Sequence, residues 1–570
     1  MKNIHNIIKL RKLNDDMKKI TKHKYIILIF LVTLIIFLNL FINPRYYGHD
    51  TIFHTANIIE LSKTINIKNI LGNNIISLKS NPFGYGTWLF YPKLPHLLGA
   101  YLYKIFDIYT SMKIVYFIIT FLSAITIYVL SKKIFNNKKI AFLSSIIYIT
   151  IPYHICEIYI RDAFAENFMF LAVPLIFLGL YNLLDNDYKK FYIYFILGYV
   201  IGMYSHLVSM VFCTIFVALF ILYHHKYFFS KEKIKSLFIS TIIVIGLTLP
   251  FLTTVIEYKL LNEYTVFLSD SFTNRATLVY RSISFKDLFI GKPIYDDIMP
   301  YFNIMTIILT LITTIQVILN KTKYKSKLLP MLLYIILLIN LVCSKLIWNN
   351  IPEIFLMLQF PWRLLVFMSV FISLYAPVCL LTDLKINIPK IFNKIIYSMI
   401  ICLVLIEGVN NIKYYSNEEY TEDYVLSSKL AMGYQQEYLP LKTNNARYFR
   451  TTYLEKRKME IVSDNNTKIS IISSSFPNLK FEVKKLKEKT KIEIPRIYYL
   501  DYILKDKDGN KVKLTMSKYG MLEADIIKEG KYELYHKNTL IETISNIIGV
   551  ATLIFVIYKL VGWRRWKANP

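Results

Sequence analysis

The sequence predicts a polytopic α-helical membrane protein with a β-rich domain outside the membrane, before its last helix. Of the 570 residues, 55% are hydrophobic and only 19% are charged, whereas soluble domains contain about 25% charged residues. The hydrophobic residues gather in long apolar runs, and lysines lie in short clusters between those runs. Together these observations exclude an ordinary soluble enzyme.

The formal net charge of +29 is also explained by a membrane protein, because its lysines lie between the apolar runs. A basic chain can bind nucleic acid, but cytoplasmic loops of membrane proteins also collect lysine and arginine. The second explanation fits the clusters better, so we expect no nucleic-acid partner. The five cysteines lie in or beside apolar segments, and no disulfide scaffold is expected.

About twelve membrane spans are expected. A polar, basic N-terminus, residues 1–24, precedes the first apolar run, 25–43, which is long enough to cross about 30 Å of hydrocarbon. Further spans are expected near 112–131, 140–155, 168–184, 191–205, 207–223, 236–255, 299–319, 328–346, 361–381, 394–410 and 541–560. The transmembrane domain is therefore expected over 25–410, and the last helix with a basic tail over 541–570.

The lysine clusters predict which side each loop faces. Alternation from a cytoplasmic N-terminus assigns to the cytoplasm the lysine-rich loops 132–139, 224–235, 320–327 and 382–393. The C-terminal tail, which contains Arg564 and Lys567, is basic as well. We therefore expect a multi-pass protein of the cell membrane whose two termini are both cytoplasmic.

Three large extracytoplasmic regions are expected, over 44–110, 256–298 and 411–540. The last is large enough to have its own core. It contains short segments of alternating polarity, typical of strands, which start at Lys468, Lys480, Lys491 and Lys531. Turn signals at Phe476-Pro-Asn and Asp506-Lys-Asp-Gly separate them. The region is expected to be a β-sandwich-like domain.

The first outer loop contains the strongest candidate for chemistry. Helical spacing places Asp50, His54 and Asn57 on one face of a helix expected over 51–63. The Asp50 carboxylate could act as a general base on an acceptor hydroxyl or hold a divalent cation. Equally, Asp50 could be only the N-cap of that helix.

Residues 81–92 follow in the same loop and contain two glycines and two prolines, so a regular helix is not expected there. Their aromatic side chains, Trp88 and Tyr91 among them, suit contacts with sugars or lipid headgroups. An interfacial aromatic belt explains them as well.

A second group of charges lies in the loop 152–167, where Glu157, Arg161 and Glu166 are close in sequence. Arginine is well suited to binding phosphate. The alternative is that Arg161 pairs with Asp162 or Glu166 and only holds the loop in shape.

Three further candidates are single residues. Arg363 ends the stretch Gln359-Phe-Pro-Trp-Arg363 at the outer mouth of a helix, where it could bind phosphate or extend to the membrane interface. His206 lies in a tight outer hairpin, where a structural role is more common. Glu437 lies in a polar, aromatic stretch at the start of the last outer region. The alternative is that this stretch is only a linker.

Several stretches, taken in order along the chain, carry a resemblance to a known family. They are Gly48-His-Asp50-Thr-Ile-Phe-His54, Gly84-Tyr-Gly with Phe90-Tyr-Pro92, Arg161-Asp-Ala-Phe-Ala-Glu166, Ser205-His206-Leu, Gln359-Phe-Pro-Trp-Arg363, Glu437-Tyr-Leu-Pro440, Ile494-Pro-Arg-Ile-Tyr-Tyr and Lys518-Tyr-Gly520. With its many spans and late outer domain, the chain resembles GT-C-type glycosyltransferases. More narrowly, it is similar to the bacterial YfhO-like group, which includes membrane proteins labelled "6-pyruvoyl-tetrahydropterin synthase-related".

The resemblance implies an enzyme that moves a sugar from a polyprenyl-phosphate carrier to an extracytoplasmic acceptor, such as a wall polymer, a glycolipid or a protein. Asp50 would be the catalytic acidic residue, as base or cation ligand, and a divalent cation is the one cofactor that the resemblance allows. Glu166 and Glu157 would compete to be a second acid, and Arg161 and Arg363 would hold the carrier phosphate. Contacts to the acceptor or the sugar would come from His54, Asn57, Trp88, Tyr91, His206 and Glu437.

Two other classes of protein remain alternatives. A transporter or flippase of lipid-linked glycans would place its charges within the spans, near the middle of the membrane. A non-catalytic accessory protein of envelope assembly would tolerate the loss of Asp50. The charges of this sequence gather instead at the expected outer surface, which favours an enzyme.

Overall fold

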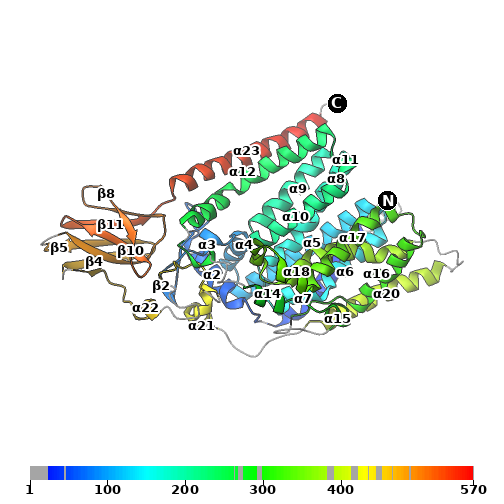
Figure 1. Cartoon of the computed structure of the whole chain (residues 1–570), viewed down its shortest axis with the longest axis horizontal. Helices are drawn as coiled ribbons and strands as arrows, with labels where there is room; N and C mark the ends of the chain where they lie inside the picture. Colours follow the sequence, from blue (N-terminus) through cyan, green and yellow to red (C-terminus); the bar gives the residue numbers. More distant parts are fainter. Residues whose placement is uncertain are drawn as a thin grey trace, which may run out of the picture.

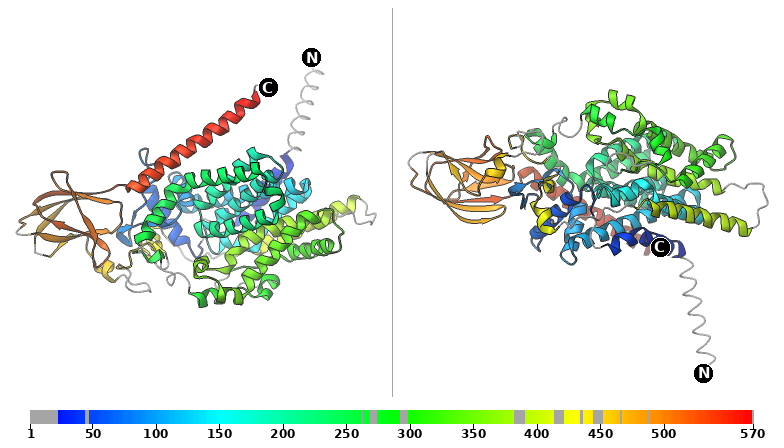
Figure 2. Two further views of the ribbon diagram at one scale, coloured as in Figure 1. Left: turned by 45° about the horizontal axis from the view of Figure 1, so that its top comes forward. Right: turned by 90° about the horizontal axis from the view of Figure 1, so that it is seen from below.

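The computed structural model describes residues 23–43, 47–261, 263–267, 274–291, 298–381, 390–412, 421–433, 436–443, 452–464, 467–486 and 489–568. Helices make up most of the molecule, and the C-terminal strands gather at one end of it (Figure 1). The views of Figure 2 show the same separation of strands from the helical body.

In the described part of the chain, eight helices are long and apolar enough to cross a membrane. They are His23–Ile42, Ile108–Phe135 (α5), Glu166–Leu184 (η1 and α8), Lys231–Leu261 (α12), Lys325–Cys343 (α17), Pro361–Leu381 (η4, α19 and η5), Ile391–Asn410 (within α20) and Leu540–Val561 (within α23). Helices α6 (Lys138–Thr150) and α7 (Pro152–Tyr159) meet at a bend of 45° and form a ninth span if they are counted together. The chain is thus a multi-pass helical membrane protein.

The expectation of about twelve full-length spans is not confirmed. The remaining expected spans are all helical, but they are short. These helices are α9 (Tyr188–Met203, 16 residues), α10 (Leu207–Tyr223, 17 residues) and α16 (Ile304–Ile318, 15 residues). These lengths lie at or below the lower end of the roughly 17–25 residues that a membrane span needs, so the described part of the chain supports eight or nine full-length spans.

The last helix, α23 (Leu540–Ala568), lies along α12, although the two are far apart in sequence (Figure 1). Small residues allow this close approach. A Cβ on Gly246 of α12 would lie 2.6 Å from Oγ1 of Thr552, and one on Gly549 of α23 would lie 2.7 Å from Cγ of Pro250. Small residues at such contacts are typical of helices that pack in membranes.

The first outer loop, as expected over 44–110, forms several short elements in its described residues. These are α2 (Thr51–Thr64), the antiparallel strands β1 (Ile76–Leu78) and β2 (Asn81–Tyr85), α3 (Thr87–Phe90) and α4 (Leu94–Tyr103). The helix expected over 51–63 is confirmed as α2, which packs against α4. Helix α21 (Glu422–Ser427) and the turn η6 (Lys429–Met432), both from the last outer region, also pack on α2.

The strand-rich region consists of two antiparallel sheets. One has the order β3-β6-β10-β9 and the other β4-β5-β11-β7-β8. The strands are β3 (Val462–Ser463), β4 (Lys468–Ser475), β5 (Asn478–Lys484), β6 (Thr490–Ile497), β7 (Tyr502–Lys505), β8 (Lys511–Val512), β9 (Leu514–Met516), β10 (Met521–Ile526) and β11 (Gly530–His536). The four strands expected from the sequence are confirmed as β4, β5, β6 and β11. Among the described residues of the expected region 411–540, the first strand is β3, at Val462.

Strand β5 shows a clear alternation of buried and more exposed side chains. In β5, Leu479, Phe481 and Val483 are buried between exposed charged residues, the pattern of a sheet with one covered face. Phe481 is paired with Tyr532 of β11, and their rings stack with centroids 5.3 Å apart. Such cross-strand pairs fix the register of the sheet.

Tyrosines attach the sheets to the rest of the molecule. The Tyr499 hydroxyl accepts a hydrogen bond from the Gly86 amide (2.9 Å) and donates one to the Tyr438 carbonyl (3.0 Å). Tyr264, which follows α12, stacks on the Tyr499 ring with centroids 5.8 Å apart. The strand-rich region is therefore joined to the first outer loop as well as to α23.

Candidate active site

The start of the first outer loop is held by backbone hydrogen bonds to the loop that follows α7. The amides of His49 and Asp50 donate to the carbonyls of Ile160 and Arg161, each at 3.0 Å. A Cβ on Gly48 would lie 2.7 Å from Cβ of Asp162, so glycine is required for this close approach. The pairing brings Asp50 beside the charges of the second loop.

Asp162, which sequence analysis considered only as a partner of Arg161, has another role. Its side chain is buried and accepts hydrogen bonds from Oγ1 of Thr51 and from the hydroxyl of Tyr116, both at 2.6 Å. Its φ of +52° is a left-handed conformation that aspartate adopts more readily than most residues. Asp162 thus fixes the N-terminus of α2, directly after Asp50.

Asp50 occupies the N-cap position of α2, but its side chain makes no capping hydrogen bond. The expected N-cap position is thus confirmed, but the side chain does not cap the helix. The carboxylate is half-buried, and burial raises its pKa above the ordinary value, although the charges of Arg161, His49 and Arg363 oppose this rise. The charges of two arginines thus act on the Asp50 carboxylate, for which no side-chain hydrogen bond is found within the described part of the chain.

Glu157, Arg161, Glu166 and Arg363 form a buried network of charges. Nη1 of Arg161 lies 2.5 Å from Oε1 of Glu157 and 3.1 Å from Oε2 of Glu166. Nε of Arg363 lies 3.1 Å from the same Glu166 oxygen. Glu166 lies in η1, directly before α8, and Arg363 lies in η4, directly before α19, so the network joins two spans at their ends. The alternative that Arg161 pairs with Glu166 to hold the loop agrees with this geometry.

The two glutamates differ in their relation to Asp50. The charge of Glu166 acts on Asp50, on Tyr91 and on His206. Its Oε1 is buried and has no hydrogen-bond partner among the described residues. Glu157 is fully buried and bonded to Arg161, and its Oε2 likewise has no hydrogen-bond partner among the described residues. Of the two candidates for a second acid, Glu166 is the one whose charge acts on Asp50.

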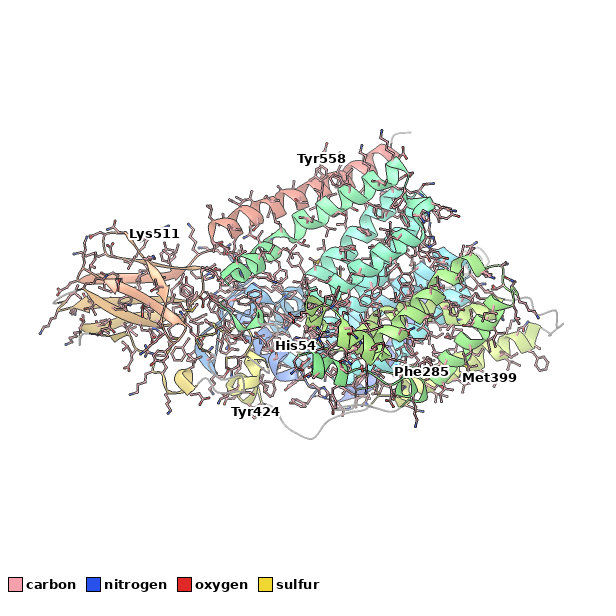
Figure 3. All side chains as sticks on the ribbon, viewed as in Figure 1. His54, Phe285, Met399, Tyr424, Lys511 and Tyr558 are labelled. Atoms are coloured by element: carbon pink, nitrogen blue, oxygen red, sulfur yellow. The ribbon has the colours of Figure 1, made fainter. Side chains whose placement is uncertain are left out.

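Histidine and aromatic rings line the side of the cluster next to α2. Nδ1 of His54 lies 2.8 Å from Nε2 of His96, and the Trp88 ring lies 4.7 Å from the His96 ring. Burial lowers the pKa of His54 to about 3, so this pair is uncharged. His54 lies near the middle of the molecule, far from Lys511 on the sheets (Figure 3).

Tyr91 also packs on this cluster, with its ring 5.7 Å from the His96 ring. Burial and the charge of Asp50 both raise the pKa of Tyr91. His206 lies at the start of α10, where its Nδ1 contacts Oγ of Ser209 at 2.8 Å and accepts from the Ser209 amide at 3.3 Å. Burial lowers its pKa to about 4. His206 is therefore a helix cap that borders Glu166 and Arg363.

Asn57 and Glu437 lie further from the charges. The Asn57 amide donates to the carbonyls of Phe53 (2.7 Å) and Ala431 (2.9 Å), and its oxygen accepts from Thr87 (2.7 Å). These contacts join α2 to η6 and α3 and leave the side chain little capacity for a ligand. Glu437 is half-buried, and its charge acts on Tyr85 and Tyr438 rather than on Asp50.

The described part of the chain contains no group of three or more histidine, cysteine, aspartate or glutamate side chains that could hold a metal ion. A divalent cation at Asp50 therefore remains a prediction from the sequence.

A scan against protein-family models gives no match, and no curated protein matches in sequence. Among solved structures, the apo crystal structure of the Archaeoglobus fulgidus oligosaccharyltransferase is similar, with 11% identity and a TM-score of 0.42. The archaeal oligosaccharyltransferase AglB from Archaeoglobus fulgidus, in complex with an inhibitory peptide and a dolichol-phosphate, is also similar, with 12% identity and a TM-score of 0.41. In both comparisons 71% of this chain is covered, and it spans 57% of the length of the other. The likeness is remote.

Proposed function

We propose that this chain is a membrane glycosyltransferase of the GT-C type that moves a sugar from a polyprenyl-phosphate carrier to an extracytoplasmic acceptor. The observation that carries the proposal is the Asp50 carboxylate, which occupies a helix N-cap position without capping the helix and lies within reach of the charges of two arginines. A structural aspartate at such a position normally accepts a hydrogen bond from the first turn. The order of motifs along the sequence supports the same class of enzyme.

In the proposed reaction, the acceptor hydroxyl oxygen attacks the anomeric carbon of the carrier-bound sugar. The bond between that carbon and the phosphate oxygen breaks, and the carrier leaves as a phosphate with an additional negative charge. Asp50 accepts the proton of the hydroxyl. Fixed cations near the departing phosphate stabilise the charge that develops there.

The geometry refines the proposed roles of the other residues. Glu166 is the better second acid, because its charge acts on Asp50, whereas Glu157 is fully buried and bonded to Arg161. Arg161 and Arg363 would add positive charge near the carrier phosphate, while the carboxylates that they contact hold them in place. Trp88, Tyr91, His54 and His206 surround this cluster and would contact the sugar or the acceptor, whereas Asn57 and Glu437 would act from the periphery.

Positions of the charges favour an enzyme over a transporter of lipid-linked glycans. Each of the three charged residues lies near a helix start: Asp50 directly before α2, Glu166 in η1, which leads into α8, and Arg363 in η4, which leads into α19. A transporter site is expected near the middle of the membrane, between broken helices. A cluster at helix starts, next to an ordered outer loop, suits a reaction at the membrane surface.

The rate of sugar transfer is expected to fall as the pH decreases. Because burial raises the pKa of Asp50, the base becomes protonated and inactive at a pH higher than the ordinary aspartate pKa of about 3.9. The acidic limb of the kcat/KM profile of the purified protein, with lipid-linked sugar and acceptor in a zwitterionic bilayer, measures this midpoint. A profile that stays flat down to the ordinary aspartate range would contradict the role of Asp50 as base.

The strand-rich region is expected to lie outside the cell. A cysteine placed at Lys511, which is exposed on β8, should react with a membrane-impermeant maleimide in intact cells. The matched control is a cysteine at Lys226, an exposed position in the expected cytoplasmic loop 224–235, which should react only after permeabilisation. The unmodified chain gives the background of its native cysteines, and the reverse labelling pattern would overturn the proposed topology.

A further inference from the structure

Three guanidinium groups converge on one aromatic ring. The central carbons of Arg281, Arg363 and Arg161 lie 4.3, 4.9 and 5.8 Å from the centroid of Phe360. Arginine commonly lies over aromatic faces, where the ring stabilises its charge. Arg281 comes from the outer loop 256–298, which sequence analysis did not connect with the site.

Gln359, the residue before Phe360, organises two of these arginines. Its φ of +66° is unusual for a residue with a side chain, and backbone conformations of this kind are concentrated at functional sites. The Gln359 carbonyl accepts a hydrogen bond from Nη1 of Arg281 (3.3 Å), and its Oε1 accepts one from Nη1 of Arg363 (2.8 Å). The same strained residue therefore positions Arg281 next to Arg363.

The three arginines differ in how their charges are balanced. Arg161 and Arg363 both contact Glu166, and Arg161 also contacts Glu157. Among the described residues, Arg281 pairs with no carboxylate, and its hydrogen bond goes to a backbone carbonyl. Burial and the charge of Arg363 both lower the pKa of Arg281, whereas the two glutamates outweigh burial and raise the pKa of Arg161.

We infer that Arg281 binds the phosphate of the lipid carrier and is the cation of this cluster that is free to do so. The inference rests on the proposed function and deepens it. A buried or half-buried cation without an anionic partner is costly, and a phosphate ester supplies the missing charge. Arginine suits this ligand because its planar group can make two parallel hydrogen bonds to phosphate oxygens. On this assignment Arg161 and Arg363 are positioning residues that Glu166 and Glu157 hold in place.

Binding of farnesyl phosphate and of farnesol to the full-length protein in phosphatidylcholine nanodiscs tests the assignment. The variants are Arg281→Gln, which removes the charge, and Lys286→Gln, which removes an exposed charge from the same loop. Arg281→Gln is expected to weaken binding of farnesyl phosphate by about tenfold or more, as for loss of a hydrogen bond between charged groups. Farnesol binding and the melting temperature should stay unchanged, and Lys286→Gln should behave as the wild type.

Inorganic phosphate, added as a competitor, separates two sources of the ligand. If inorganic phosphate displaces farnesyl phosphate from the wild type but not from Arg281→Gln, the site recognises phosphate alone. If inorganic phosphate does not displace farnesyl phosphate from the wild type, the site recognises the prenylated ester. Unchanged farnesyl phosphate affinity in Arg281→Gln, or an equal loss for farnesol, would overturn the inference while leaving the proposed function intact. A wild-type protein that binds both prenyl ligands equally would overturn the two together.

Discussion

The Asp50→Asn variant is expected to lose sugar transfer by about two to four orders of magnitude, the range typical of general acid–base catalysis, and to accumulate normally in the membrane. Asparagine is nearly isosteric with aspartate and is itself a good N-cap residue. The fold also does not depend on the carboxylate, because Asp50 makes no capping hydrogen bond and the backbone amide at position 50 holds the loop to Arg161. The variant therefore removes the base and little else.

Mass analysis of lipid-linked sugars and of surface polymers, in a deletion strain that expresses each variant, measures the loss. The matched control is Asp107→Asn. Asp107 is the N-cap of α5 and does accept a hydrogen bond from the Thr110 amide, at 2.9 Å, so its replacement tests a capping aspartate away from the cluster. Full transfer by Asp50→Asn, with protein levels equal to those of the control, would refute the catalytic assignment and favour an accessory protein.

Glu166→Gln is expected to destabilise the protein by roughly 3–5 kcal/mol, the cost of removing one partner from a buried ion pair. The Glu166 side chain is only 3% exposed and shares one oxygen between Arg161 and Arg363. The neutral amide leaves Arg363 without its carboxylate, and Arg161 then keeps only Glu157. A large loss is therefore expected although the change in volume is small.

Thermal unfolding of the purified protein and its level in the membrane measure this effect. The control is Glu533→Gln, which breaks the ion pair between Glu533 and Lys480. Both of these side chains are about half exposed, at 51% and 52%. A loss of stability below about 1 kcal/mol is therefore expected for the control. The double variant Glu166→Gln, Arg363→Gln should be more stable than the sum of the single losses predicts, because it removes both charges together. Additive losses would contradict a coupled network.

Much of the fold could be predicted from local patterns. A helix is found at each of the spans expected from apolar runs, and a strand is found at each of the four segments expected from alternation, β4, β5, β6 and β11. The number of full-length spans could not be predicted in this way, because apolar content does not show where a helix starts and ends. Helices α9, α10 and α16 are apolar enough to be recognised but too short to be counted as spans.

The site was predictable where its residues are close in sequence. Glu157, Arg161 and Glu166 are neighbours in one loop, and their pairing follows from that spacing. Contacts between distant residues left no local signal: Asn57 donates to Ala431, 374 positions later in the sequence. The convergence of Arg281 on Phe360 likewise depends on how α14 (Arg275–Tyr280) is placed by the rest of the fold.

The long sequence separation within the charge cluster has a consequence for biosynthesis. The chain is made from its N-terminus, so Asp50, Glu157, Arg161 and Glu166 enter the membrane region before Arg281 and Arg363. Until then, three carboxylates face a single guanidinium, an imbalance that is costly to bury. The nascent cluster is therefore expected to stay hydrated or protonated until the helix at Pro361–Leu381 is inserted, when Arg363 pairs with Glu166 and the buried network can close.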